Sequence, residues 1–199
     1  MLPLENLTLS GLLARTARTY PTRPAVWFDG KYTTYAELER QVIECAGRLM
    51  TLGVRRGDRV AILSDPRPYG IAAMYAVEYI GAVAVMLNTS LNLPELLPLI
   101  EQTGAEYLLL GHADKGDGYF EAELDGAVLP ECLRHIVSLR HNCGTYPVLG
   151  DLAPADERAV RAAADAVTPQ DTATILFTSG STSRPKAVCT SHYSRVNGG

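Results

Sequence analysis

The sequence predicts an α/β fold built on a mostly parallel sheet with flanking helices. A compact apolar strand at 59–63, an apolar helix at 69–80 and a second strand at 82–87 follow one another through short links. This strand, helix, strand order is the repeating unit of parallel sheets. A helix at 93–102 and a strand at 106–110 continue the same alternation.

The segment that precedes this unit predicts two helices separated by a hairpin. Apolar residues within 7–19 recur at helical spacing and fall on one face. Asp29 and Gly30 then lie between two short extended runs, the strongest hairpin signal in the chain. Thr34 begins the second helix, because Glu37 follows three residues later and completes a capping box.

The segment that follows the strand at 106–110 is less regular. A short helix within 119–130, a strand at 134–139 and an alanine-rich helix at 155–167 are expected in turn. The chain then enters a β-branched and aromatic strand at 174–177. Pro98 lies inside the helix predicted at 93–102 and should kink it, at a cost of roughly 3 kcal/mol if nothing compensates.

The strand at 174–177 runs into a loop suited to binding phosphate. Six small residues at 178–183, five of them with hydroxyls, precede Arg184 and Lys186. Backbone N–H groups and hydroxyls can converge on anionic oxygens where no bulky side chain blocks the approach, and a lysine adds charge. A plain serine-rich surface turn has the same composition, so spacing alone leaves both interpretations open.

Two better-known phosphate loops do not fit this segment. The Walker pattern requires a second glycine before the lysine and a hydroxyl after it, but Pro185 and Ala187 stand there. The dinucleotide pattern needs three glycines, and Gly180 is alone. A Walker ATPase and a Rossmann dehydrogenase are therefore disfavoured.

Composition narrows the class further. Apolar residues make up 47% and charged residues 20% of 199 residues, which predicts a folded globular domain. The net charge is −4 and the basic residues are scattered, so no nucleic-acid surface is expected. Glu78 interrupts the longest apolar run, so no transmembrane segment is expected. Four cysteines without a C-x-x-C pair predict reduced thiols in a cytoplasmic protein, with metal ligation a poor second.

Several blocks of this chain resemble the adenylate-forming (AMP-binding) superfamily. Residues 178–186 look like its signature loop, and blocks at 34–38, 57–61 and 79–88 are similar to earlier motifs in the same order. His192 also stands where the family often has a histidine. The superfamily includes acyl-CoA synthetases, aryl and acetyl-CoA ligases, luciferases and the adenylation domains of nonribosomal peptide synthetases.

The resemblance implies an ATP-dependent acid–thiol ligase, most like the fatty or aryl acyl-CoA synthetase branch. A small-molecule carboxylic acid would attack the α-phosphate of ATP with Mg²⁺, and coenzyme A or a carrier-protein thiol would then take the acyl group. Lys186 would offset charge as pyrophosphate leaves. None of the loop residues is expected to be a nucleophile, and no catalytic residue is assigned. The implied ligands of the β- and γ-phosphates are Thr178, Ser179, Gly180, Ser181, Thr182 and Ser183.

Two positions depart from the family pattern, which usually has glycine where Ser183 and Ala187 stand. If the loop needs a positive φ at either position, a β-carbon costs on the order of 1 kcal/mol. Weakened nucleotide binding is the resulting hypothesis. Titration of Mg-ATP into wild type and Ser183→Gly tests it, because equal dissociation constants would contradict it.

Family members are much longer than 199 residues, so residues 1–199 are expected to be the N-terminal part of an adenylation domain, without the C-terminal domain. The sheet should then be incomplete, with an exposed edge through which the chain could associate, and the segment alone should not catalyse adenylation. Three alternatives stay open. They are a peptide synthetase adenylation fragment, a non-catalytic interaction module, and an unrelated parallel α/β protein.

Overall fold

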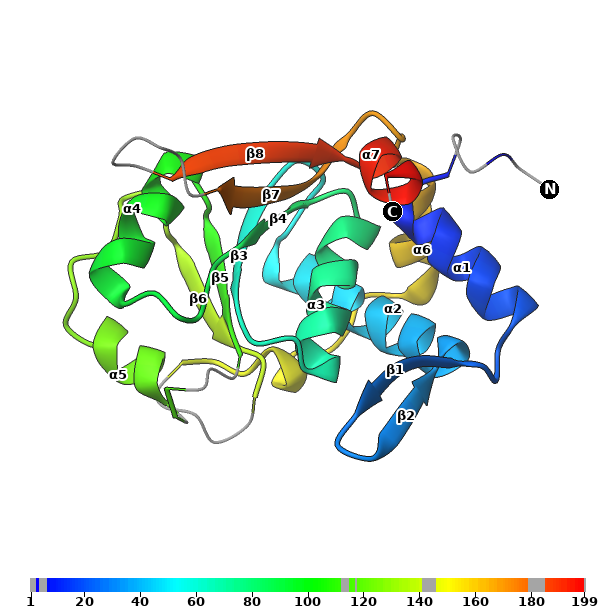
Figure 1. The fold of residues 1–199 in the computed structure, drawn as a ribbon, viewed down its shortest axis with the longest axis horizontal. Helices are drawn as coiled ribbons and strands as arrows, with labels where there is room; N and C mark the ends of the chain where they lie inside the picture. The colour runs from blue at the N-terminus through cyan, green and yellow to red at the C-terminus, as the bar shows by residue number, and fades with distance from the viewer. Residues whose placement is uncertain are drawn as a thin grey trace.

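The structure is a computed structural model that describes residue 3 and residues 7–111, 115–116, 118–140, 146–178 and 185–198. A six-stranded sheet runs through its centre in the order β6-β5-β3-β4-β7-β8 (Figure 1). The first five strands of this order are parallel, and only β8 is antiparallel to its neighbour. The strands are β3 (Arg59–Leu63), β4 (Val83–Met86), β5 (Tyr107–Leu110), β6 (His135–Ser138), β7 (Thr172–Thr178) and β8 (Lys186–Ser191).

Helices cover both faces of this sheet (Figure 1). One face carries α1 (Leu9–Thr19), α2 (Tyr35–Leu52), α3 (Pro68–Tyr79) and α6 (Glu157–Asp165). The other face carries α4 (Leu93–Thr103) and α5 (Tyr119–Leu124). A turn of 3-10 helix, η2 (Leu149–Asp151), precedes α6, and α7 (His192–Asn197) follows β8. The α/β class and the mostly parallel sheet predicted from the sequence are confirmed.

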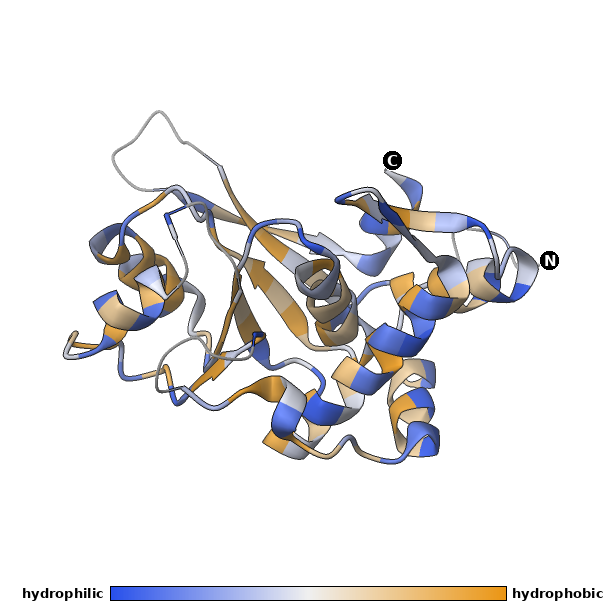
Figure 2. Ribbon diagram, turned by 90° about the horizontal axis from the view of Figure 1, so that it is seen from below, coloured by the Kyte–Doolittle hydropathy of each residue, from blue (hydrophilic) through white to orange (hydrophobic). Residues whose placement is uncertain are grey.

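The central strand β3 shows why two cores form. Val60 and Ile62 pack with α2 and α3, whereas Ala61 and Leu63 pack with α4 on the opposite face. Successive side chains of a strand point to opposite faces, so a strand covered on both sides is apolar throughout. Figure 2 shows the result as hydrophobic strands between helices whose outer faces are hydrophilic.

The predicted local signals before the sheet are confirmed in detail. A separate hairpin of β1 (Pro24–Phe28) and β2 (Lys31–Thr34) turns at Asp29 and Gly30, which have φ of 48° and 75°. Thr34 caps α2, and its capping box with Glu37 is complete in both directions. The capping box therefore places the start of α2 from local chemistry alone.

The sequence prediction missed the end of the sheet. No strand or helix was predicted for residues 186–197, but they form β8 and α7. β8 is an edge strand of the described sheet, and its side chains are mostly exposed or half-buried. Leu176 and Val188, opposite each other on β7 and β8, are 39% and 42% exposed. The strand does not show the buried apolar pattern by which the central strands were recognised.

Candidate functional site

The candidate phosphate loop is the turn of the β7–β8 hairpin. Thr178 is the last residue of β7 and pairs in register with Lys186, the first residue of β8. Because β7 is parallel to β4, Thr178 and its partner Lys186 lie at the carboxyl edge of the sheet, where open α/β sheets bind ligands. The other predicted loop residues, Ser179, Gly180, Ser181, Thr182 and Ser183, lie outside the described residues.

Thr178 and Lys186 are the two predicted phosphate-binding residues that the structure describes, and both are exposed. The Lys186 side chain makes no hydrogen bond or ion pair with any described residue. Pro185 borders a cavity of about 910 Å³ together with one face of α4, including Pro98 and Gln102. The lining of this cavity also includes the carboxylates of Glu95 and Glu101 and does not include Lys186, so only the Lys186 ammonium group, and not the cavity, favours an anionic ligand.

Ala187 is not strained. It lies in β8 and pairs with Phe177 of β7, and among the described residues Asp29 is the only non-glycine residue with a positive φ. The β-carbon of Ala187 therefore adds no backbone strain, because a strand conformation suits every L-residue. Of the two departures from the family pattern, only Ser183 retains a possible cost, and it lies outside the described residues.

The base of the β7–β8 hairpin is tied to α3 by a buried carboxyl group. The Thr174 hydroxyl on β7 donates a hydrogen bond of 2.6 Å to Oε1 of Glu78, which is fully buried. Nη2 of Arg195 on α7 lies 3.9 Å from the same oxygen. Burial raises the pKa of Glu78 to about 7, against the lowering effects of Thr174 and Arg195. Glu78 thus joins three elements and titrates near neutrality.

His192 performs a similar role on the other side of the hairpin base. Its ring is fully buried at the start of α7, and Nδ1 accepts a hydrogen bond of 3.3 Å from the backbone N–H of Leu9 on α1. Burial lowers the pKa of His192 to about 4. The neutral imidazole is therefore a structural link between α1 and α7, which explains the histidine singled out in the sequence.

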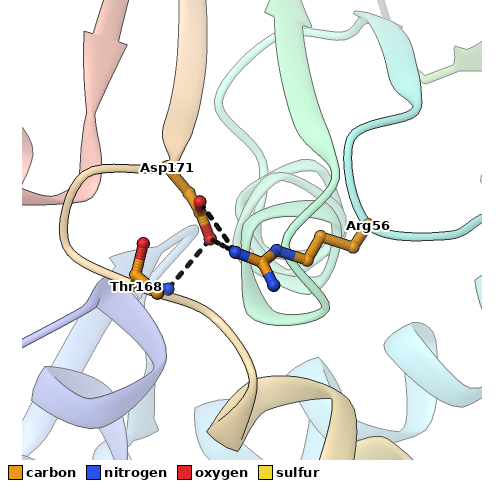
Figure 3. A network of polar contacts seen from close by, with 3 residues as sticks. All are labelled: Arg56, Thr168 and Asp171. Atoms are coloured by element: carbon orange, nitrogen blue, oxygen red, sulfur yellow. Dashed lines mark hydrogen bonds and ion pairs between the residues drawn. The ribbon is translucent and has the colours of Figure 1, made fainter.

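An ion pair fixes the entry of the chain into β7 (Figure 3). Nη2 of Arg56, in the loop before β3, contacts both carboxylate oxygens of Asp171 at 2.9 and 2.7 Å. The backbone N–H of Thr168 donates to the same carboxylate at 2.9 Å. Burial tends to raise the pKa of Asp171, but the hydrogen bonds from Arg56 and Thr168 outweigh it and hold the pKa below its usual range.

Sequence reasoning missed these anchors because their partners are far apart in the chain. Glu78 and Thr174 are separated by 96 positions, and Arg56 and Asp171 by 115. The one available signal was an acid at position 78 within an apolar run, which was used only to argue against a membrane span. A buried acid needs a hydrogen-bond partner, so Glu78 within this apolar run predicts a donor from another part of the chain.

The carboxyl edge also holds a polar contact between two neighbouring loops. The Thr89 hydroxyl, after β4, donates a hydrogen bond of 2.6 Å to Oδ1 of Asp65, after β3. Oδ2 of Asp65 is buried without a partner. Within the described ranges, no group of three or more His, Cys, Asp or Glu side chains could hold a metal ion. None of the described helices combines the length and hydropathy needed to cross a membrane.

Comparison with known proteins shows the family of this chain. The profile of the family described as AMP-binding enzyme matches residues 13–198. The chain belongs to this family. A propanoyl:CoA ligase of Mycobacterium tuberculosis whose acyl group carries a 7a-methyl-1,5-dioxo-octahydroindene ring system is 36% identical over 191 residues, which are 93% of this chain and 36% of the relative.

Two further matches cover the same portion of longer proteins. The 2-succinylbenzoate–CoA ligase of Bacillus velezensis is 34% identical over 177 residues, 88% of this chain and 32% of the relative. The inhibitor-bound N-terminal domain of FACL13 from Mycobacterium tuberculosis superimposes with a TM-score of 0.75 at 27% identity, covering 93% of this chain and 44% of that domain. The chain thus spans about a third of the length of these curated relatives.

Proposed function

We propose that residues 1–199 form the N-terminal portion of an adenylation domain in an ATP-dependent acid–thiol ligase. The reaction would activate a carboxylic acid as an acyl-adenylate and then transfer the acyl group to coenzyme A. Both curated relatives described above are named as CoA ligases, which supports coenzyme A over a carrier-protein thiol as the acceptor. The cytoplasmic location expected from the sequence stays a prediction.

The observation that carries the proposal is the exposed Lys186 paired across the hairpin with Thr178. In the proposed role, the Lys186 ammonium group and the Thr178 hydroxyl face the β- and γ-phosphates, together with the hydroxyls and backbone N–H groups of residues 179–183. Positive charge that is already in place stabilises pyrophosphate as it leaves, without reorganisation at the moment of reaction. Bound ATP would bring Mg²⁺ on its own phosphate oxygens, the usual mode for this ion.

The direct test is titration of inorganic pyrophosphate and of Mg-ATP into residues 1–199. Lys186→Ala should weaken pyrophosphate binding by about tenfold, since a hydrogen bond to a charged group contributes on the order of 1.5 kcal/mol. Lys186→Arg should retain most of the affinity. Lys31→Ala removes an equally exposed lysine from β2 and is the matched control. Equal affinity in Lys186→Ala and Lys31→Ala would refute the proposed role.

A second measurement addresses activity. We expect residues 1–199 alone to show no carboxylate-dependent exchange of pyrophosphate into ATP, because they correspond to about a third of each curated relative. Exchange by these residues alone would contradict this expectation. Stoichiometric binding to a separate chain would instead favour the non-catalytic interaction module.

A further inference from the structure

A second cavity lies at the N-terminal end of α3. It has a volume of about 470 Å³ and is bordered by the β1–β2 hairpin, α2, the first turns of α3, and η2. This volume is within the range of small-molecule sites in proteins. None of its lining residues also lines the cavity beside Pro185.

The walls of this cavity are mainly apolar. Phe28, Cys45, Ala72, Leu139 and Leu149 reach it from five different segments of the chain. The α2 wall is more polar, because this helix also contributes Gln41, Glu44 and Arg48 to the lining. An occupant therefore needs an apolar body against the side chains of Phe28, Ala72 and Leu149, and any charge it carries must face the polar part of the lining.

Two arginines border the cavity, and their situations differ. Nη2 of Arg48 is paired with Glu44 at 2.7 Å, and its Nε donates to the backbone carbonyl of Leu152 at 3.1 Å. Arg67 lies with its guanidinium carbon 5.3 Å from the centre of the Phe28 ring and, within the described residues, makes no hydrogen bond or ion pair through its side chain. The described lining thus carries one uncompensated positive charge, on Arg67.

The stacking on Phe28 leaves the edges of the guanidinium group available. A guanidinium group has five N–H donors in its plane and no acceptor, and it matches a carboxylate through two parallel hydrogen bonds. The Phe28 ring lies within cation–π distance of the guanidinium carbon and favours a positive charge at this place. Arg67 is half-buried and its N–H donors have no described acceptor, so it can bind a carboxylate.

We propose that this cavity is a binding site for a small amphipathic carboxylate, with its carboxylate on Arg67 and its apolar body against Phe28, Ala72 and Leu149. The site is separate from the proposed phosphate loop and does not depend on it. A purely structural role for Arg67, limited to its contact with Phe28, is the competing explanation. The two differ in whether removal of the guanidinium group changes the affinity for a carboxylate.

Octanoate is a suitable probe, and 1-octanol is its neutral counterpart. We expect octanoate, without nucleotide, to bind residues 1–199 in a one-to-one ratio by calorimetry. In two-dimensional NMR it should shift the amide signals of Phe28, Cys45 and Ala72. Arg67→Met keeps an unbranched side chain over the Phe28 ring and should weaken octanoate binding by at least about tenfold. It should leave the weaker binding of 1-octanol unchanged.

Three further variants complete the test. Arg158→Met removes an exposed arginine of α6 and should leave octanoate affinity unchanged. Ala72→Leu should weaken both probes by filling the cavity, provided that its melting temperature stays close to wild type. Lys186→Ala should not affect octanoate, so failure of this site and failure of the proposed function are distinguishable.

Specific outcomes overturn the proposal. The proposal is wrong if octanoate shows no saturable binding, or if wild type and Arg67→Met bind it with equal affinity. Arg67 would then have only a structural role, through its contact with Phe28. NMR shifts centred on Thr178 and Lys186 instead of Phe28 would place the carboxylate at the proposed phosphate site and would overturn the proposal. Because Arg67→Met keeps the apolar contact, the test does not depend on whether Ala72→Leu folds.

Discussion

The two ends of the β7–β8 hairpin differ in almost every physical respect. At the base, Glu78, Thr174 and His192 are buried and hydrogen-bonded to distant elements. At the turn, Thr178 and Lys186 are exposed, and Lys186 has no acceptor in the described part of the chain. A hairpin anchored at its base can leave Thr178 and Lys186, at its other end, available to a ligand. Stability should depend on the base, and phosphate binding on the turn.

The largest effect is expected from removal of the hydroxyl that donates to Oε1 of Glu78, since Oε2 of the same buried carboxyl group already has no hydrogen-bond partner among the described residues. Thr174→Val keeps the shape of the side chain but leaves Oε1 of a fully buried carboxyl group without its hydrogen bond. We expect the free energy of unfolding to fall by about 3 kcal/mol near neutral pH, the upper range for a buried charged group that loses its partner. Denaturant unfolding measures it. Thr174→Ser retains the hydroxyl and should cost clearly less; equal losses would show that the hydrogen bond is unimportant.

A second effect concerns the two buried titratable groups, which oppose each other. The pKa of Glu78 is raised to about 7, so folded protein binds more protons than unfolded protein above the ordinary carboxyl pKa, and stability falls as pH rises to about 7. The pKa of His192 is lowered to about 4, so stability rises with pH between about 4 and its ordinary value. In wild type these slopes partly cancel.

Single variants should separate the two slopes. Glu78→Gln should leave a curve that rises with pH, whereas His192→Asn should leave one that falls. The expected change is on the order of 2 kcal/mol between about pH 5 and 7. Denaturant unfolding at several pH values measures it, and Lys31→Ala serves as a control with the wild-type pH profile. If the free energy of unfolding changed with pH in the same way in Glu78→Gln and His192→Asn, the opposite effects assigned to Glu78 and His192 would be wrong.

A smaller effect is expected at the entry to β7. Arg56 and Asp171 form an ion pair, but the Arg56 side chain is 48% exposed, so solvent screens the attraction. Arg56→Met should lower the free energy of unfolding by only about 0.5 kcal/mol. It should also raise the pKa of Asp171 toward its ordinary value, because the largest of the hydrogen bonds that lower it is lost. NMR titration of Asp171 measures this pKa, and an unchanged value would show that Thr168 alone sets it.

The smallest effect on stability is expected at the turn. Lys186→Ala removes an exposed side chain without a described partner, so the free energy of unfolding should change by less than about 0.5 kcal/mol. The same variant should lose pyrophosphate affinity, as set out above. A large loss of stability in Lys186→Ala would show that the turn is part of the anchor and would remove the contrast between the two ends.

Local sequence signals determined most of the elements of this protein. The capping box of Thr34 and Glu37, the turn at Asp29 and Gly30, and the apolar strands needed only neighbouring residues, and all were predicted. The loop at 178–186 was also singled out by composition and resemblance. Its phosphate-binding role stays a prediction, because most of it lies outside the described residues.

Only the tertiary structure decided what holds that loop in place and where a second site could lie. β8 pairs with β7 through backbone hydrogen bonds, which leave little trace in an exposed edge sequence. Glu78 finds Thr174, and Arg67 lies on Phe28, because chain segments far apart in sequence pack together. Long-range packing sets burial and hydrogen-bond partners, and these in turn set which charges are satisfied and which stay available to a ligand.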